Sequence, residues 1–225
     1  MRSARARPAS LAPSRARRRA LALLAAAAVL ALPACGDASP ETLGLGPAPA
    51  PPPWTTGFER EWFYPAHLDK PGNDRRWAHL AAYVGRQAPE LQLDQWRFGK
   101  RRLAELRGKV VLLDFWATWC GECLDAVPVT NALREELADE PFEVVGLCAP
   151  KGAEDYAATL SESGLAFPTG VDTDGDMQRA FGVPRWPYYV LLDADGVIAA
   201  AGLHPEHAGD AVRHLLAAER ARGAL

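Results

Sequence analysis

The sequence predicts an α/β domain in which a mixed central sheet is covered by helices on both faces. Residues 109–116, KVVLLDFW, form a nearly continuous apolar run, which is typical of a central parallel strand buried on both faces. A helical stretch follows, and then a second apolar run at residues 142–149, FEVVGLCA. A hairpin and an amphipathic helix are predicted near the C-terminus, and a hairpin requires antiparallel pairing. The sheet is therefore expected to be mixed.

The predicted domain, residues 86–225, is one compact unit, because the chain is long enough for one sizeable core but tight for two. Residues 91–106 suggest a hairpin with its turn near the Phe-Gly pair at 98–99. The helix between the two apolar runs should begin near Cys120. We expect it to bend at Pro128, because proline inside a helix removes a hydrogen bond.

The second half of the domain alternates between helical and extended patterns. Residues 152–164 are interpreted as a helix that ends at their final glycine, and residues 177–183 as a short helix. Residues 188–202 are expected to form a hairpin with its turn at the Asp-Gly pair. Residues 206–222 form the terminal amphipathic helix of the prediction.

The first 34 residues, 1–34, are predicted to be a signal peptide of the lipoprotein type. They contain seven arginines and no acidic residue, and an apolar run at 20–32 follows the basic region. This run is shorter than the roughly 20 residues of a membrane span and suits the core of a signal peptide. The stretch LPAC resembles a bacterial lipoprotein box, in which Cys35 takes a lipid and becomes the new N-terminus. The alternatives are an uncleaved anchor and a soluble secreted protein.

Two segments are expected between the leader and the domain. Residues 35–53 are rich in proline and have little to bury, so we interpret them as a disordered tether that holds the domain off the membrane. Residues 54–85 form an extension rich in aromatic side chains, and some of these rings are expected to pack on the main domain. A partner-binding arm is the alternative interpretation of this extension.

The charge of the chain argues against a nucleic-acid binder. The net charge is −3, and it is −10 once the seven arginines of the leader are removed. Neutralising nucleic-acid phosphates needs clustered lysine and arginine, which an acidic mature chain does not supply. The export signal instead places the mature chain outside the cytoplasm, where disulfides persist.

Cys120 and Cys123 are separated by two residues, and three kinds of site have this spacing. A structural zinc site needs four ligands, and beyond this pair the domain offers Cys148 and the distant His204 and His207. A purely structural disulfide across so short a loop removes little chain entropy and stabilises little. The third kind of site, a redox pair, fits the local physics best.

The redox interpretation depends on the start of the predicted helix. Cysteines at positions i and i+3 of a first helical turn lie within disulfide reach. The free N–H groups and the positive dipole end of the helix stabilise a thiolate on the first cysteine. Cys120 is therefore the predicted nucleophile, and Cys123, one turn further in, is predicted to resolve the mixed disulfide.

The segment DFWATWCGEC, residues 114–123, resembles the active-site segment of thioredoxin-fold proteins. Over residues 86–222 the chain resembles the TlpA/ResA-like extracytoplasmic thiol–disulfide oxidoreductase family. The buried strand, the tryptophan before the first cysteine, Pro128 and the stretch GVPRWPYYVLL carry this likeness. The resemblance implies an α/β, thioredoxin-like three-layer fold, with a mixed central sheet and helices on both faces, and thiol–disulfide exchange as the activity.

The resemblance also implies further site residues around the cysteine pair. It places a cis peptide bond before Pro187, which exposes the backbone of Trp186 to an incoming substrate strand. An ordinary trans proline at a strand start is the alternative. Trp119 is expected to pack beside the site and shield it, with plain core packing as the alternative. Gly121 and Glu122, between the cysteines, complete the predicted substrate-contact and tuning residues.

Asp114 interrupts the apolar strand that leads to the cysteines. A buried carboxylate is costly when ionised, so its pKa should rise, and Asp114 is predicted to shuttle a proton for Cys123. The alternative is an aspartate at the strand end that reaches water. Cys148 is expected to be a buried, inert thiol, with a third redox thiol as the alternative.

Glu122 stands where relatives usually have proline. Proline has a fixed φ suited to a helix start and no N–H, whereas glutamate adds a negative charge beside the thiols. The helix dipole tolerates this charge, but the charge should oppose a thiolate on Cys120 and raise its pKa. We therefore expect a less acidic Cys120 and a more reducing couple than in a version with proline.

These observations predict a membrane-tethered extracytoplasmic thiol–disulfide oxidoreductase, and family analogy makes it reductive, as in cytochrome c maturation. The cysteine pair carries the two electrons, so we expect no dissociable cofactor and no metal. Expected partners are protein thiol or disulfide substrates and a membrane electron donor. The chain is expected to be a monomer anchored through Cys35 and facing the periplasm or the cell exterior.

Two alternative functions remain open. The first is a thiol peroxidase on the same fold. Such enzymes typically carry a P-x-x-x-[TS]-x-x-C loop, whereas Ala117 stands at the threonine or serine position here. The second is a thioredoxin-like module that binds a partner or delivers metal.

Overall fold

The computed structural model describes residues 49–50, 57–59, 62–63 and 82–225. The predicted signal peptide, Cys35, and most of the tether and of the extension lie outside these residues. Within the described ranges, every helix falls short of the length and apolar character that a membrane span needs.

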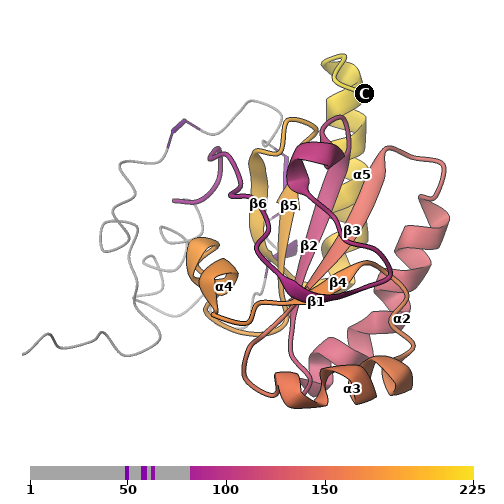
Figure 1. Cartoon of the computed structure of the whole chain (residues 1–225). Coiled ribbons are helices and arrows are strands. Elements are labelled where there is room, and N and C mark those ends of the chain that lie inside the picture. Colours follow the sequence, from indigo (N-terminus) through magenta and orange to yellow (C-terminus); the bar gives the residue numbers. More distant parts are fainter. Residues whose placement is uncertain (1–48, 51–56, 60–61, 64–81) are drawn as a thin grey trace, which may run out of the picture. The chain divides into compact units, whose positions relative to one another are not determined.

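The domain is built on a six-stranded sheet with the order β1-β4-β3-β2-β5-β6 (Figure 1). The three adjacent strands β4, β3 and β2 run parallel to one another, whereas β1, β5 and β6 pair antiparallel with their neighbours. The predicted mixed sheet is therefore confirmed. The strands are β1 (Asp94–Arg97), β2 (Val110–Trp116), β3 (Phe142–Cys148), β4 (Thr169–Val171), β5 (Tyr188–Leu192) and β6 (Ile198–Leu203).

Helices cover both faces of this sheet, as predicted. The α-helices are α2 (Gly121–Glu136), α3 (Tyr156–Ser163), α4 (Asp176–Ala180) and α5 (Pro205–Ala221), with 3-10 turns η4 (Leu103–Leu106) and η5 (Ala153–Asp155). Alternate residues of β2 point to opposite faces. Val110 and Leu112 join a core with α2, α3 and α5, whereas Val111 and Leu113 join a second core with α4 and η4.

One predicted element is wrong. Residues 91–106 do not form a hairpin, because β1 pairs with β4 and the residues after the turn form η4. The Glu90 carboxylate accepts hydrogen bonds from the backbone N–H groups of Leu103, at 2.6 Å, and Ala104, at 3.1 Å. Leu103 and Leu106 are three residues apart, so one helical turn buries both side chains on the same face. The chain does turn at Phe98 and Gly99, which have φ angles of 57° and 95°.

The described part of the aromatic extension packs on the domain, as expected. Phe58 and Trp62 form edge-to-face contacts with His214 of α5, at ring-centroid distances of 5.1 and 5.8 Å. The carbonyl of Trp62 accepts a hydrogen bond from the N–H of His204 at 2.8 Å, and Phe63 forms an antiparallel bridge with Leu203. The extension therefore covers part of the open edge of β6, where unpaired backbone groups would otherwise be exposed.

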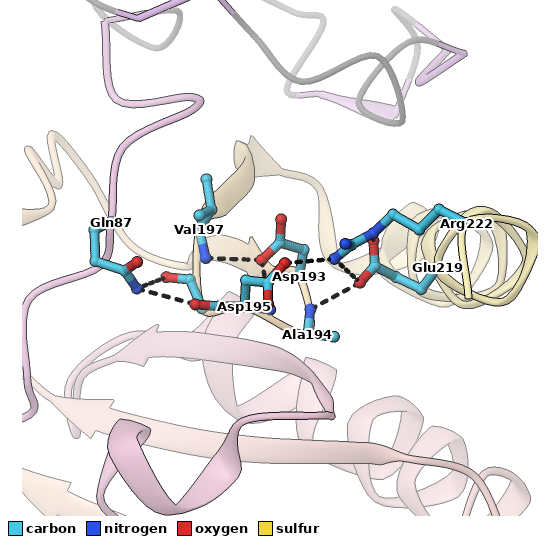
Figure 2. A network of polar contacts seen from close by, with 8 residues as sticks. Gln87, Asp193, Ala194, Asp195, Val197, Glu219 and Arg222 are labelled. Atoms are coloured by element: carbon cyan, nitrogen blue, oxygen red, sulfur yellow. Dashed lines mark hydrogen bonds and ion pairs between the residues drawn. The ribbon is translucent and has the colours of Figure 1, made fainter. Parts of the chain in front are cut away.

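A buried carboxylate fastens the end of α5 to the turn between β5 and β6 (Figure 2). Glu219 is fully buried and accepts a hydrogen bond from the N–H of Ala194 at 3.0 Å. Arg222 donates two hydrogen bonds to the same carboxylate, both 2.6 Å long, and one to Asp195, 2.9 Å long. These contacts lie at the end of β5 away from Pro187, so they stabilise the fold without reaching the cysteine pair.

We expect Glu219→Ala to lower the free energy of unfolding by about 2–3 kcal/mol, because it leaves a buried N–H without an acceptor and breaks a buried ion pair. The cost stays below that of a fully buried pair because Arg222 is partly exposed and keeps Asp195 as a partner. Urea denaturation at neutral pH measures the difference. The matched control is Glu135→Ala on the exposed side of α2, which should change stability by less than about 0.5 kcal/mol. Equal losses in the two variants would contradict the role of Glu219.

Candidate active site

The two cysteines of the sequence motif form a disulfide at the start of α2, with their Cα atoms 5.2 Å apart. Cys120 is the N-cap residue, and Cys123 lies in the first turn and donates its backbone N–H to the Cys120 sulfur at 3.2 Å. Both residues are buried, and Cys120 is the more exposed of the two, at 7% against 3%. A backbone donor and the helix N-terminus thus face the sulfur of the predicted nucleophile, which favours its thiolate after reduction.

In the part of the chain that the structure describes, no three histidine, cysteine or acidic side chains lie close enough together to hold a metal ion. His204 and His207 occupy the start of α5, with their ring centroids 6.1 Å apart. The Nδ1 atom of His204 accepts a hydrogen bond from the N–H of Glu206 at 3.3 Å, so His204 caps the helix. His204 therefore has a structural role as a helix cap, and His207 lies in the first turn of the same helix.

Asp114 is buried in β2, with 4% of its surface exposed, so the alternative of a strand-end aspartate in contact with water is wrong. Burial raises the pKa of its carboxyl to about 7, and a hydrogen bond with Tyr189 lowers it by less. This agrees with the predicted rise. A pKa near 7 suits a group that takes up and returns protons at neutral pH, so the proton-shuttle role of Asp114 stays a supported prediction.

The peptide bond between Trp186 and Pro187 is cis, as the family resemblance implies. The Trp186 ring meets the Trp119 ring edge to face, with centroids 5.6 Å apart. Trp119 is half exposed, so plain core packing is wrong for this residue. Its ring is fixed by a 2.9 Å hydrogen bond from Nε1 to the carbonyl of Lys151, whose ammonium lies 5.5 Å from the ring centroid. The two indoles therefore form an aromatic surface beside the cysteines.

Gly121 is exposed, and apart from its two chain neighbours and the backbone of its own helix, no atom lies within 4 Å of the position that a Cβ would occupy there. The space next to the disulfide is therefore open to an approaching substrate. Cys148 is fully buried in β3, and burial raises the pKa of its thiol to about 12. Its Sγ lies 3.6 Å from the carbonyl of Ala149. These surroundings favour the expected inert thiol over a third redox group.

Glu122 has a partner that the sequence did not reveal. Its carboxylate lies 3.8 Å from the Arg185 guanidinium, and its side chain is 72% exposed. Arg185 belongs to the loop before Pro187, so the ion pair links the cysteine motif to that loop. A nearby cation and solvent both weaken the field of the Glu122 charge at the thiols. The effect of Glu122 on the redox couple should therefore keep its predicted sign but be small.

We expect Glu122→Pro to raise the reduction potential of the pair by roughly 10–20 mV, because it removes a charge that opposes the thiolate. Equilibration with glutathione buffers, followed by alkylation of free thiols, gives the potential. Arg185→Gln is the matched control, since it leaves Glu122 without its cation and should move the potential in the opposite direction. Shifts of the same sign in both variants would show that charge is not the cause.

Sequence reasoning missed Arg185, Tyr189 and Thr130, which contact or support the predicted site residues. Arg185 and Tyr189 lie within the proline stretch that the resemblance singled out, but their partners lie far away in the sequence. Thr130 hydrogen-bonds Tyr189, with 2.8 Å between the two hydroxyl oxygens. In the sequence, the only indication of a role for Thr130 is that it is a polar residue on the apolar face of a predicted helix.

Comparisons with known proteins agree with this geometry. Residues 84–201 match the model of the AhpC/TSA family. The thiol-disulfide oxidoreductase ResA of Bacillus thuringiensis is 29% identical over 51% of this chain and 66% of its own length, slightly under two thirds. The thioredoxin-like protein YneN of Bacillus subtilis is 35% identical over 51% of this chain and 68% of its own length.

Solved structures give the same result for the fold. A protein from Chlorobium tepidum, described as a candidate thiol:disulfide interchange protein DsbE, superposes with a TM-score of 0.53 at 29% identity. The superposition covers 60% of this chain and 96% of that one. The thioredoxin-like three-layer fold predicted from the sequence is thereby confirmed. The chain belongs to the AhpC/TSA family of thioredoxin-fold proteins, and its relatives include ResA-type thiol–disulfide oxidoreductases, as its sequence resemblance indicated.

Proposed function

We propose that this chain is an extracytoplasmic, membrane-tethered thiol–disulfide oxidoreductase that works in the reductive direction through its Cys-Gly-Glu-Cys pair. The observation that carries the proposal is the Cys120–Cys123 disulfide at the N-terminus of α2. A backbone donor at the first sulfur and the open space at Gly121 support attack at Cys120. The ResA relatives support the activity, and the reductive direction is an inference from family analogy.

The reaction consists of two exchanges. The Cys120 thiolate attacks one sulfur of a substrate disulfide, so the substrate bond breaks, one substrate sulfur leaves as a thiolate, and a mixed disulfide forms. Cys123 then gives up its proton and attacks the Cys120 sulfur, which releases the second substrate thiolate. The substrate gains two electrons and the enzyme pair is left as a disulfide. A membrane electron donor of the dithiol class must reduce it again.

Protein substrates are the proposed class. The aromatic surface of Trp119 and Trp186 offers contact area for apolar side chains beside the substrate disulfide. The backbone of Trp186 is the proposed partner of an extended substrate segment. Attachment through a lipid on Cys35 is proposed from the leader sequence, and the cysteine pair itself serves in place of a dissociable cofactor.

A trapping experiment tests this function. In the full-length chain, expressed with its leader, Cys123→Ser is expected to accumulate mixed disulfides through Cys120, because the resolving thiol is missing. Mass spectrometry of the adducts identifies the substrates. The double variant Cys120→Ser, Cys123→Ser is the control and should carry none. A Cys123→Ser chain free of adducts would contradict the exchange mechanism.

A further inference from the structure

Three buried polar side chains from three elements are joined in a row that runs from the sheet to α2, the helix that begins at the cysteine pair. Asp114 of β2 and Tyr189 of β5 are directly opposite in the antiparallel register, so their side chains lie on the same face of the sheet. The Tyr189 hydroxyl hydrogen-bonds the Asp114 carboxyl and lies 2.8 Å from the Thr130 hydroxyl of α2. All three residues are at most 4% exposed. Water therefore has little access to this row.

The row ends on the helix that carries the resolving cysteine. Thr130 follows Cys123 by seven residues, which is two helical turns, so both side chains lie on the same face of α2. Val127, one turn from each, is buried in the same core as Cys123. The carboxyl in the sheet and the helix with Cys123 are thus connected through two hydroxyl groups.

Hydroxyl groups suit this position because each can donate one hydrogen bond and accept others. With Asp114 ionised, Tyr189 donates to the carboxylate and Thr130 donates to Tyr189. With Asp114 protonated, the carboxyl donates to Tyr189, Tyr189 donates to Thr130, and Thr130 turns its hydrogen to a helix carbonyl one turn earlier. The carboxyl therefore has a partner in both protonation states without any movement of heavy atoms.

We propose that Tyr189, supported by Thr130, is a positioning residue that holds Asp114 and pairs its carboxyl in both protonation states, so that Asp114 can take and return the Cys123 proton. The proton transfer rests on the proposed exchange function, whereas the pairing does not. Tyr189 touches neither sulfur of the disulfide in this role. It acts through Asp114.

The surroundings of Asp114 leave few other groups that could set its titration. Opposite it in β3 lies Gly146, which has no side chain. The α5 residues in the core shared with β2 are apolar, and Glu219, the buried carboxylate of α5, is paired with Arg222 at the C-terminal end of that helix. On this face α2 contributes Cys123 as its titratable group. Among the described residues, burial raises the pKa of Asp114 to about 7, and the hydrogen bond with Tyr189 opposes this rise by a smaller amount. Loss of the Tyr189 hydroxyl should therefore raise the pKa of the Asp114 carboxyl.

The test is a pH titration of the Asp114 carboxyl by ¹³C NMR in the oxidised full-length protein, where Cys123 has no proton to lose. Tyr189→Phe is expected to raise the midpoint by about one pH unit, because the ionised form loses a hydrogen bond. Thr130→Val should raise it by less, because Tyr189 keeps its contact with Asp114. Tyr188→Phe is the matched control. It removes a tyrosine hydroxyl from the preceding residue, which packs in the core on the other face, and should leave the midpoint unchanged.

A folded Tyr189→Phe variant with the wild-type midpoint would overturn the proposal, and so would an equal shift in Tyr188→Phe. Near-ultraviolet circular dichroism establishes that each variant is folded. The pH dependence of the second exchange step, the release of a mixed disulfide with a model peptide, should move in Tyr189→Phe by the same amount as the midpoint. A Cys123→Ser protein that forms no mixed disulfide would contradict the proposed function, whereas the titration would still decide the role of Tyr189.

Discussion

Replacing Cys120 by serine is expected to reduce thiol–disulfide exchange to the background of the assay, whereas replacing Cys148 by alanine should leave the rate unchanged. The thiolate is the attacking group, and a serine hydroxyl at neutral pH cannot replace it. Cys120 caps α2 and receives the N–H of Cys123. Burial instead raises the pKa of Cys148 to about 12, so this residue stays a protonated thiol. Reduction of a peptide disulfide by the reduced protein, followed by stopped-flow fluorescence, measures the rates.

The order of attack is tested by a third variant in the same assay. Cys123→Ser should react once with the peptide at a rate near that of the wild type and then stop at the mixed disulfide, because nothing resolves it. A second turnover in this variant, or residual exchange in Cys120→Ser that Cys148→Ala abolishes, would show that the roles of the cysteines are assigned wrongly.

The features predictable from the sequence are those that depend on neighbours along the chain. The apolar run of β2 must be buried on both faces, whichever strands and helices pack against it. The structure buries all its residues. The cysteine pair is likewise defined within one helical turn, so its disulfide reach follows from local geometry. The hairpin of β5 and β6 could be identified because its Asp-Gly turn lies between two apolar strands.

The features that could not be predicted depend on pairing between distant segments. The three residues of β4 carry no pattern of their own, yet β4 takes β1 as its antiparallel partner and leaves no hairpin for residues 91–106. The partner of Asp114 is fixed by the register of β2 against β5, in which a shift of one residue would turn Tyr189 to the other face. Arg185, in the loop before β5, meets Glu122 in the first turn of α2, and no spacing in the sequence encodes that contact.

The Asp114→Asn variant is expected to be more stable than the wild type above pH 7, by about 4 kcal/mol at most. The carboxyl has a pKa of about 7 in the folded protein, whereas an aspartate in an unfolded chain has a pKa near 3.9. Each unit of this difference corresponds to about 1.4 kcal/mol of stability. Because the folded pKa is the higher one, the folded state binds the proton more tightly. The stabilisation from this proton is fully present below pH 4 and is lost as the pH rises to 7.

Asparagine does not titrate, so the stability difference between the two proteins must itself depend on pH. Urea denaturation of the oxidised proteins should give a difference of several kcal/mol at pH 8.5 and of less than about 1 kcal/mol at pH 4, where both side chains are neutral. The matched control is Asp125→Asn on the exposed side of α2, which should give small differences at both pH values. A constant advantage of Asp114→Asn at both pH values would mean that packing, rather than ionisation of a buried carboxyl, sets the cost of Asp114. A chain that keeps so costly a group gains a buried proton acceptor with a pKa near 7, which a core optimised for stability alone would lack.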